Sequence, residues 1–243
     1  VGIPLLLASG EVIRGRRVIV PERADQLEIT PERLESWVRD GWVDLRRENC
    51  ARWIERFRRI QEETATEVIV HITGRDRNLI GLHSELMGAH LLGIRSILAV
   101  TGDPVAVSSE TGSSSVFDVN SIGLLKLLDA LNQGRTAYGA DLSGRTSFLL
   151  GAAFNPNVAD LSGQLRKLDK KISAGAKFIQ TQPVYDVATM SRLMQETATL
   201  QIPVLLGIMP LVSERNAEFL HNEVPGIYLP ESVRNSCLLY TSP

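Results

Sequence analysis

The amino-acid sequence predicts an α/β fold built on a parallel sheet, and three observations support this. Short apolar runs rich in bulky or β-branched residues recur along the chain, helix-length segments separate them, and glycines stand where those segments should end. A buried parallel strand forms a continuous apolar run, because helices cover both faces of its sheet. The five runs are residues 67–72, 96–101, 147–153, 177–181 and 203–208. Five consecutive strand–helix units therefore predict the α/β class.

The helices between these runs have their own signals. Residues 79–92 and 121–132 are long enough for three or more turns, and a third helix shows apolar residues at spacings of three and four. The apolar residues of the third helix are Leu161, Leu165, Leu168 and Ile172, and the terminating glycines are Gly93, Gly134 and Gly175. The first sixty residues are less regular. Residues 15–20 and 26–29 fit strands, a helix follows the N-cap Thr30, and another is expected over 53–63.

Composition and charge exclude several classes of protein. The chain has 243 residues, of which 44% are apolar and 22% charged, as in a globular domain. Its net charge of −2 argues against nucleic acid or an anionic membrane as the main partner. Two cysteines, Cys50 and Cys237, cannot form a disulfide framework and so predict a reducing, cytoplasmic location. The apolar runs are too short to span a bilayer.

Two α/β architectures fit this pattern. A dinucleotide-binding doubly wound sheet carries G-x-G-x-x-G after its first strand, and the sequence has no such spacing. A (β/α)8 barrel instead carries polar residues at the carboxyl ends of several strands. Such residues are present: His71 and Thr73, Thr101 and Asp103, Asn155, and Gln180 and Gln182. The sequence therefore predicts a TIM (β/α)8 barrel.

Several positions at this edge are candidate ligand contacts. Gly102 permits a tight turn, and Asp103 would project over the barrel mouth to hold a polar heterocycle or a developing positive charge, unless this is an ordinary turn. The planar amide of Gln182 suits a pterin or flavin edge, with a structural glutamine as the alternative. Taken alone, His71 fits a core histidine and Lys171 a solvated helix face. No residues show metal-ligand spacing.

Six motifs, in order between about residues 61 and 234, resemble methylenetetrahydrofolate reductase, in the bacterial type found fused behind a homocysteine S-methyltransferase domain. They are residues 74–82, 98–104, 116–123, 174–186, 207–211 and 215–226. The resemblance implies a TIM barrel that binds FAD without a covalent bond. It also implies that NADH or NADPH reduces the flavin, which then reduces 5,10-methylenetetrahydrofolate to 5-methyltetrahydrofolate for methionine synthesis.

The resemblance implies roles for residues that act on the substrate. Asp103 would lie between flavin and folate, where its charge tunes the flavin and stabilises the cationic iminium form of the substrate. Gln182 would hydrogen-bond the pterin. The family's general acid is a glutamate at the end of the first strand, and its nearest candidate here is Glu28. Glu214 stands where the family has an apolar side chain.

The resemblance also implies cofactor contacts. His71, Thr101 and Gly102 fall at flavin-contacting positions, together with Asp103, and Phe154 falls near the edge of the flavin. Lys171 matches a lysine that reaches the FAD diphosphate, which replaces the interpretation of a solvated face.

The resemblance also implies how the chain is divided into segments. Residues 1–60 would be a divergent part of the barrel or a preceding segment, residues 61–234 the reductase-like barrel, and residues 235–243 a tail without an element pattern. The barrel is expected to be incomplete at its C-terminus. A folate is the expected small-molecule partner, and a homo-oligomer and a fused or partner homocysteine S-methyltransferase domain are compatible with it. The alternatives are a flavin-free pterin-binding or folate-binding barrel and an inactive truncated fragment.

Overall fold

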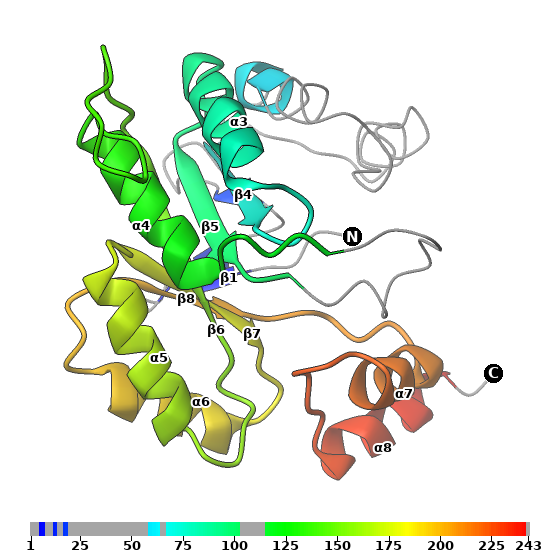
Figure 1. Cartoon of the computed structure of the whole chain (residues 1–243). Helices are drawn as coiled ribbons and strands as arrows, with labels where there is room; N and C mark the ends of the chain where they lie inside the picture. The colour runs from blue at the N-terminus through cyan, green and yellow to red at the C-terminus, as the bar shows by residue number, and fades with distance from the viewer. Residues whose placement is uncertain are drawn as a thin grey trace. The chain divides into compact units, whose positions relative to one another are not determined.

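The computed structural model describes residues 5–7, 12–13, 17–18, 58–63, 67–102 and 115–241 (Figure 1). The chain forms two compact units. The N-terminal unit is Arg17–Leu150, and the C-terminal unit combines Val1–Arg16 with Gly151–Pro243. No helix among the described residues is long and apolar enough to cross a membrane.

The N-terminal unit contains strands paired in both directions. Strand β3 (Arg17–Val18) is antiparallel to β4 (Glu67–Thr73), which is parallel to β5 (Ser96–Val100). Helix α3 (Leu79–Leu91) connects β4 to β5, and α4 (Ser121–Asn132) comes after β5 in the chain. This strand–helix–strand order with parallel pairing is the βα unit that the apolar runs predict.

Local signals fix the ends of these helices. Asn78 caps α3 and Asn120 caps α4, each by accepting hydrogen bonds from backbone N–H groups of the first turn. Gly93 and Gly134 follow the two helices with φ of 87° and 76°, values that favour glycine. The predicted terminating glycines are confirmed. Residues 58–63 are also helical, in agreement with the later part of the helix expected over 53–63.

The C-terminal unit holds the other strands. Strand β1 (Leu5–Leu7) is antiparallel to both β2 (Val12–Ile13) and β8 (Val204–Gly207). Strand β8 is parallel to β7 (Phe178–Pro183), and β7 is parallel to residues 151–154 of β6 (Leu149–Phe154). Among the residues that the structure describes, the sheet of neither unit closes on itself.

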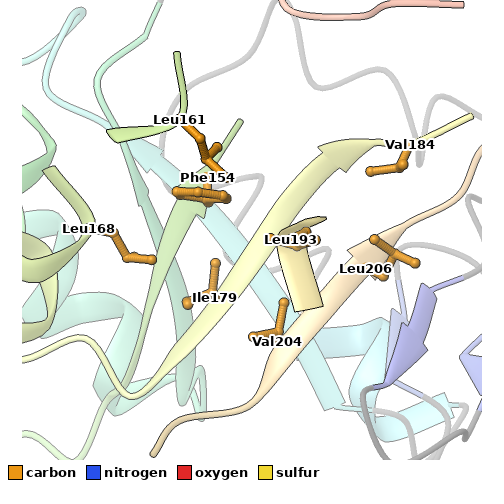
Figure 2. Close-up of a cluster of buried hydrophobic side chains, with 8 residues drawn as sticks. All are labelled: Phe154, Leu161, Leu168, Ile179, Val184, Leu193, Val204 and Leu206. Atoms are coloured by element: carbon orange, nitrogen blue, oxygen red, sulfur yellow. The ribbon is translucent and has the colours of Figure 1, made fainter. Parts of the chain in front are cut away.

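Helices α5 (Ser162–Ser173) and α6 (Val187–Thr197) follow β6 and β7 in the chain. Buried apolar side chains of these strands and helices form the core of the C-terminal unit, and Figure 2 shows them together. Burying one such side chain contributes roughly 1.5–3 kcal/mol. The cluster consists of Phe154, Leu161, Leu168, Ile179, Val184, Leu193, Val204 and Leu206.

A second apolar cluster joins α7 (Glu214–Asn222) to the segment that leads into α8 (Glu231–Thr241). Its buried members are Ala217, Leu220 and Leu229. Each helix has a glutamate in its first turn, where a negative charge interacts favourably with the helix dipole. This interaction with the dipole of α7 accounts for a carboxylate at position 214. Residues 235–243 were expected to have no element pattern, but α8 continues through them to Thr241.

The predicted fold class is confirmed, because five strands alternate with helices along the chain and pair in parallel within each unit. This arrangement fits part of a (β/α)8 barrel. Of the strand expected over 15–20, the structure describes β3. The strand expected over 26–29 and the helix expected after Thr30 lie outside the described residues.

Candidate functional site

Threonine hydroxyls organise the carboxyl ends of β4 and β5. Thr73 donates a hydrogen bond through Oγ1 to the Thr101 carbonyl oxygen at 2.8 Å, and the same Oγ1 accepts one from the Arg75 N–H at 2.9 Å. Thr101 in turn donates through its own Oγ1 to Ser121 Oγ at 3.1 Å. Ser121 is the first residue of α4, so the predicted flavin-contacting position Thr101 lies beside a helix N-terminus.

Gly102 has the positive φ that the predicted tight turn would require. Its φ is 88°, and a Cβ atom there would lie 2.3 Å from Thr73 Oγ1 and 2.9 Å from Arg75 Cβ. Only glycine fits, because both the backbone conformation and the space exclude a side chain. The segment that the backbone approaches is therefore the end of β4. Asp103 follows directly but lies outside the described residues, as does Glu28.

His71 lies on the face of β4 opposite to the core. Val70 and Ile72 on either side of it are 1% exposed, whereas the imidazole of His71 is exposed. The interpretation of His71 as a core histidine is therefore wrong, since successive side chains of a strand point to opposite faces. Among the described residues, no group of three or more histidine, cysteine or acidic side chains could hold a metal ion.

Lys171 reaches the sheet from α5. Its Nζ donates a hydrogen bond to the carbonyl oxygen of Ala153 on β6 at 2.6 Å. Burial lowers the pKa of Lys171, and the nearby charge of Lys167 lowers it further. An ammonium group has three N–H donors, and within the part of the chain that the structure describes Lys171 uses one of them in this bond. Lys171 is thus a cation directed inward and not part of a solvated face.

Phe154, the last residue of β6, is a core residue. It is 4% exposed and packs in the same cluster as Leu161 and Leu168 (Figure 2). Packing against the helices accounts for this aromatic side chain, and its contact with a flavin stays a prediction.

The carboxyl end of β7 is irregular at Gln182. Gln180 and Gln182 share a face of the strand, and Gln182 is exposed, whereas Thr181 between them is buried. The pairing of β7 with β8 shifts register between Gln180 and Pro183. Gly207 of β8 donates its N–H to Thr181 Oγ1 at 2.9 Å in place of a regular strand partner. Such a bulge redirects the side chains next to it and is frequent beside active sites.

Two asparagine side chains lie against this end of β7. Asn157 donates two hydrogen bonds through Nδ2, to the carbonyl oxygens of Pro183 and Gly226, both at 2.9 Å. A Cβ atom on Gly226 would lie 2.8 Å from Asn155 Nδ2 and 4.0 Å from Gln182 Cγ. Asn155 was predicted from its place after a strand, whereas Asn157 and Gly226 were not predicted. Asparagine at 157 and Pro-Gly at 225–226 are turn signals, and nothing in them indicates that the two turns meet.

The loop after β6 is fixed by Arg192 of α6. Its guanidinium donates to the carbonyl oxygens of Pro156 at 3.0 Å, Val158 at 2.9 Å and Ala159 at 3.4 Å. Charged donors make strong hydrogen bonds, and the planar guanidinium orients several at once. The backbone on both sides of Asn157 is therefore bonded to α6.

Comparison with known proteins gives several relatives. Methylenetetrahydrofolate reductase 1 of Schizosaccharomyces pombe is 30% identical over 158 residues, which are 63% of this chain and 24% of that protein. Methylenetetrahydrofolate reductase (NADH) 1 of Arabidopsis thaliana is 28% identical over 182 residues, 69% of this chain and 29% of that protein. The chain thus spans about a quarter of the length of the curated relatives it matches.

Among solved structures, 2,3-dimethylmalate lyase, a member of the PEP mutase/isocitrate lyase superfamily, aligns with 84% of this chain and 67% of its own. The identity is 13% and the TM-score is 0.48, which is too low to support an argument about this chain.

Two family models match the sequence. Residues 1–74 match the beta-methylindole-3-pyruvate reductase C-terminal domain. Residues 46–238, most of the chain, match methylenetetrahydrofolate reductase. This second match includes Thr101 directly after β5, Lys171 on α5 and Gln182 on β7. The chain therefore belongs to the methylenetetrahydrofolate reductase family.

Proposed function

We propose that this chain reduces 5,10-methylenetetrahydrofolate to 5-methyltetrahydrofolate with electrons from NADH or NADPH. Family membership supports this, and the observation that carries it is the position of Gln182. Its side chain is exposed at a bulge at the carboxyl end of β7, and the carboxyl ends of barrel strands are where such enzymes bind substrates. A glutamine amide both donates and accepts, so it complements the donor–acceptor edge of a pterin.

The proposed cofactor is FAD, and the side chains present fit it. Lys171 has two N–H donors beyond the one given to Ala153, and these suit the oxygens of a diphosphate. In the N-terminal unit, the exposed His71 and the Thr101–Gly102 segment would supply polar contacts for a flavin. When bound, FAD supplies hydride transfer between nicotinamide and folate.

Two carboxylates would complete the chemistry. Asp103, directly after the Gly102 turn, would stabilise the cationic iminium form of the substrate by its negative charge. Glu28 would donate a proton to the folate nitrogen as the methylene bridge opens. Gln182 would orient the pterin for both events, so its amide acts on binding more than on proton transfer.

A visible absorption spectrum of the purified chain, followed by anaerobic addition of NADH and then NADPH, tests the proposal. A yellow protein that bleaches supports FAD and the reductive half-reaction. A colourless protein that takes up no FAD but binds 5-methyltetrahydrofolate would favour a flavin-free pterin-binding barrel. A protein that binds neither would contradict the proposed function.

Gln182 and Gln180 form a matched pair for the folate half of the reaction, because they share a strand and a face. Gln182→Ala should raise the KM for the folate by about tenfold, since one or two hydrogen bonds to the substrate are lost. Gln180→Ala should change it by less than about twofold. Equal effects of the two substitutions would contradict the role given to Gln182.

A further inference from the structure

We propose that Asn157 is a positioning residue for Gln182, which it holds through the backbone of β7. The proposal rests on the proposed function, because it assigns a substrate contact to Gln182. Asn157 itself does not reach the substrate in this scheme. It fixes the end of β7 at Pro183 and the turn at Gly226. The Gln182 side chain lies next to both.

Strand β7 has no regular ladder with β8 at Gln182. The register of β7 with β8 shifts there, and Gly207 is bonded to the side chain of Thr181 and, through its carbonyl oxygen, to the N–H of Val184 at 3.0 Å. A strand end without regular pairing needs another restraint to keep a side chain in one orientation. Asn157 supplies that restraint at Pro183, one residue beyond Gln182.

Asn157 is itself held in place by hydrogen bonds of its backbone and its side chain. Its backbone N–H donates to Asn155 Oδ1 at 2.9 Å, an Asx turn that orders the segment after β6. Both hydrogens of its Nδ2 amide are used, on carbonyl oxygens of Pro183 and Gly226 that lie 26 and 69 residues away in the chain. One amide therefore joins three segments: the loop after β6, the end of β7 and the turn between α7 and α8.

Gly226 lies next to the side chains of Asn155 and Gln182. Its φ of 83° favours glycine, and a Cβ atom would come within 2.8 Å of Asn155 Nδ2. The backbone can thus approach the amide of Asn155 and the stem of Gln182 only because no side chain is present. Displacing this turn would change the space that Gln182 occupies.

The test is a binding measurement with 5-methyltetrahydrofolate as the probe, using isothermal titration of the full chain. Asn157→Asp keeps the shape but removes both donors and places a carboxylate against two carbonyl oxygens. We expect affinity to fall roughly tenfold, the loss that corresponds to one or two hydrogen bonds. Gly226→Ala disturbs the same junction from the other side and should also weaken binding.

A double-mutant cycle separates positioning from general destabilisation. If Asn157 acts through Gln182, adding Asn157→Asp to Gln182→Ala should cost little further affinity. The control is Asn132→Asp in the N-terminal unit, where Asn132 Nδ2 donates to the Phe148 carbonyl oxygen at 2.9 Å. It should lower the melting temperature but leave the folate affinity within about twofold.

Each outcome of these measurements either supports or contradicts the positioning role of Asn157. Unchanged affinity in Asn157→Asp, or losses that add in the double variant, would overturn the positioning role while the proposed function stands. A wild-type chain that binds no folate would overturn the proposed function and this inference with it. If Asn157→Asp does not fold, Asn157→Ser, which keeps one O–H donor, and Gly226→Ala provide the same comparison. Folate affinity unchanged in both of these would overturn the positioning role.

Discussion

Replacing Phe154 with alanine should destabilise the C-terminal unit by about 3–5 kcal/mol, the usual loss for a phenylalanine removed from a packed core. The ring is 4% exposed and packs in a cluster of eight buried residues, so its removal leaves a cavity that the fixed strands β6 and β7 cannot close. For a chain of this size, such a loss lowers the melting temperature by roughly 10 °C.

Phe219 is the matched control, because it has the same side chain but is 55% exposed on α7 of the same unit. Phe219→Ala should cost less than about 1 kcal/mol. Urea unfolding followed by circular dichroism measures both variants against the wild type. Equal losses in the two would refute the assignment of Phe154 to the core.

A third variant tests the role that the family resemblance implies for Phe154. Phe154→Leu keeps most of the apolar volume, so it should cost less than about 1.5 kcal/mol. If packing is the whole role of Phe154, FAD affinity should be unchanged in this variant. An FAD titration followed by flavin fluorescence measures this. A stable Phe154→Leu variant with FAD affinity reduced by about tenfold would show that the aromatic ring itself contacts the flavin.

Three further predictions concern single positions. Gly102→Ala should lower the melting temperature more than Gly139→Ala, because both glycines have positive φ but only the first would bring a Cβ against a threonine of β4. Burial lowers the pKa of Lys171 from its ordinary 10.5, so the unfolded chain binds more protons above the lowered pKa and stability should rise as the pH increases toward 10.5. Urea unfolding at several pH values should show that Lys171→Met loses this rise, whereas Lys170→Met on the exposed face keeps it. Asn120→Ala should cost about 1 kcal/mol in urea unfolding, since the cap of α4 is lost.

Elements set by local signals were predictable from the sequence. Helix α4 was expected over residues 121–132 and has those bounds, because Asn120 caps it and Gly134 ends it. The five strands β4 to β8 were expected within one or two residues of their ends, since each is a short apolar run between turn residues. Strands β1 and β2 were not expected, because they are only three and two residues long.

The candidate site was only partly predictable, because its contacts join distant segments. The conformation of Gly102 follows from its place after a strand, but Asn157 depends on two carbonyl groups that only the folded chain brings to it. The inward direction of Lys171 likewise depends on how α5 packs on β6. The roles of Asp103 and Glu28 stay predictions, as do the cytoplasmic location and a methyltransferase partner.

The hydrogen bonds of Arg192 have a consequence for local unfolding. The carbonyl oxygens of residues 156, 158 and 159 are bonded to a side chain of α6, so the order of this loop depends on a helix that follows it in the chain. Separation of α6 from the sheet would release the loop as well. The two segments should therefore open as one cooperative unit and show similar protection in hydrogen exchange, even though β7 separates them in the sequence.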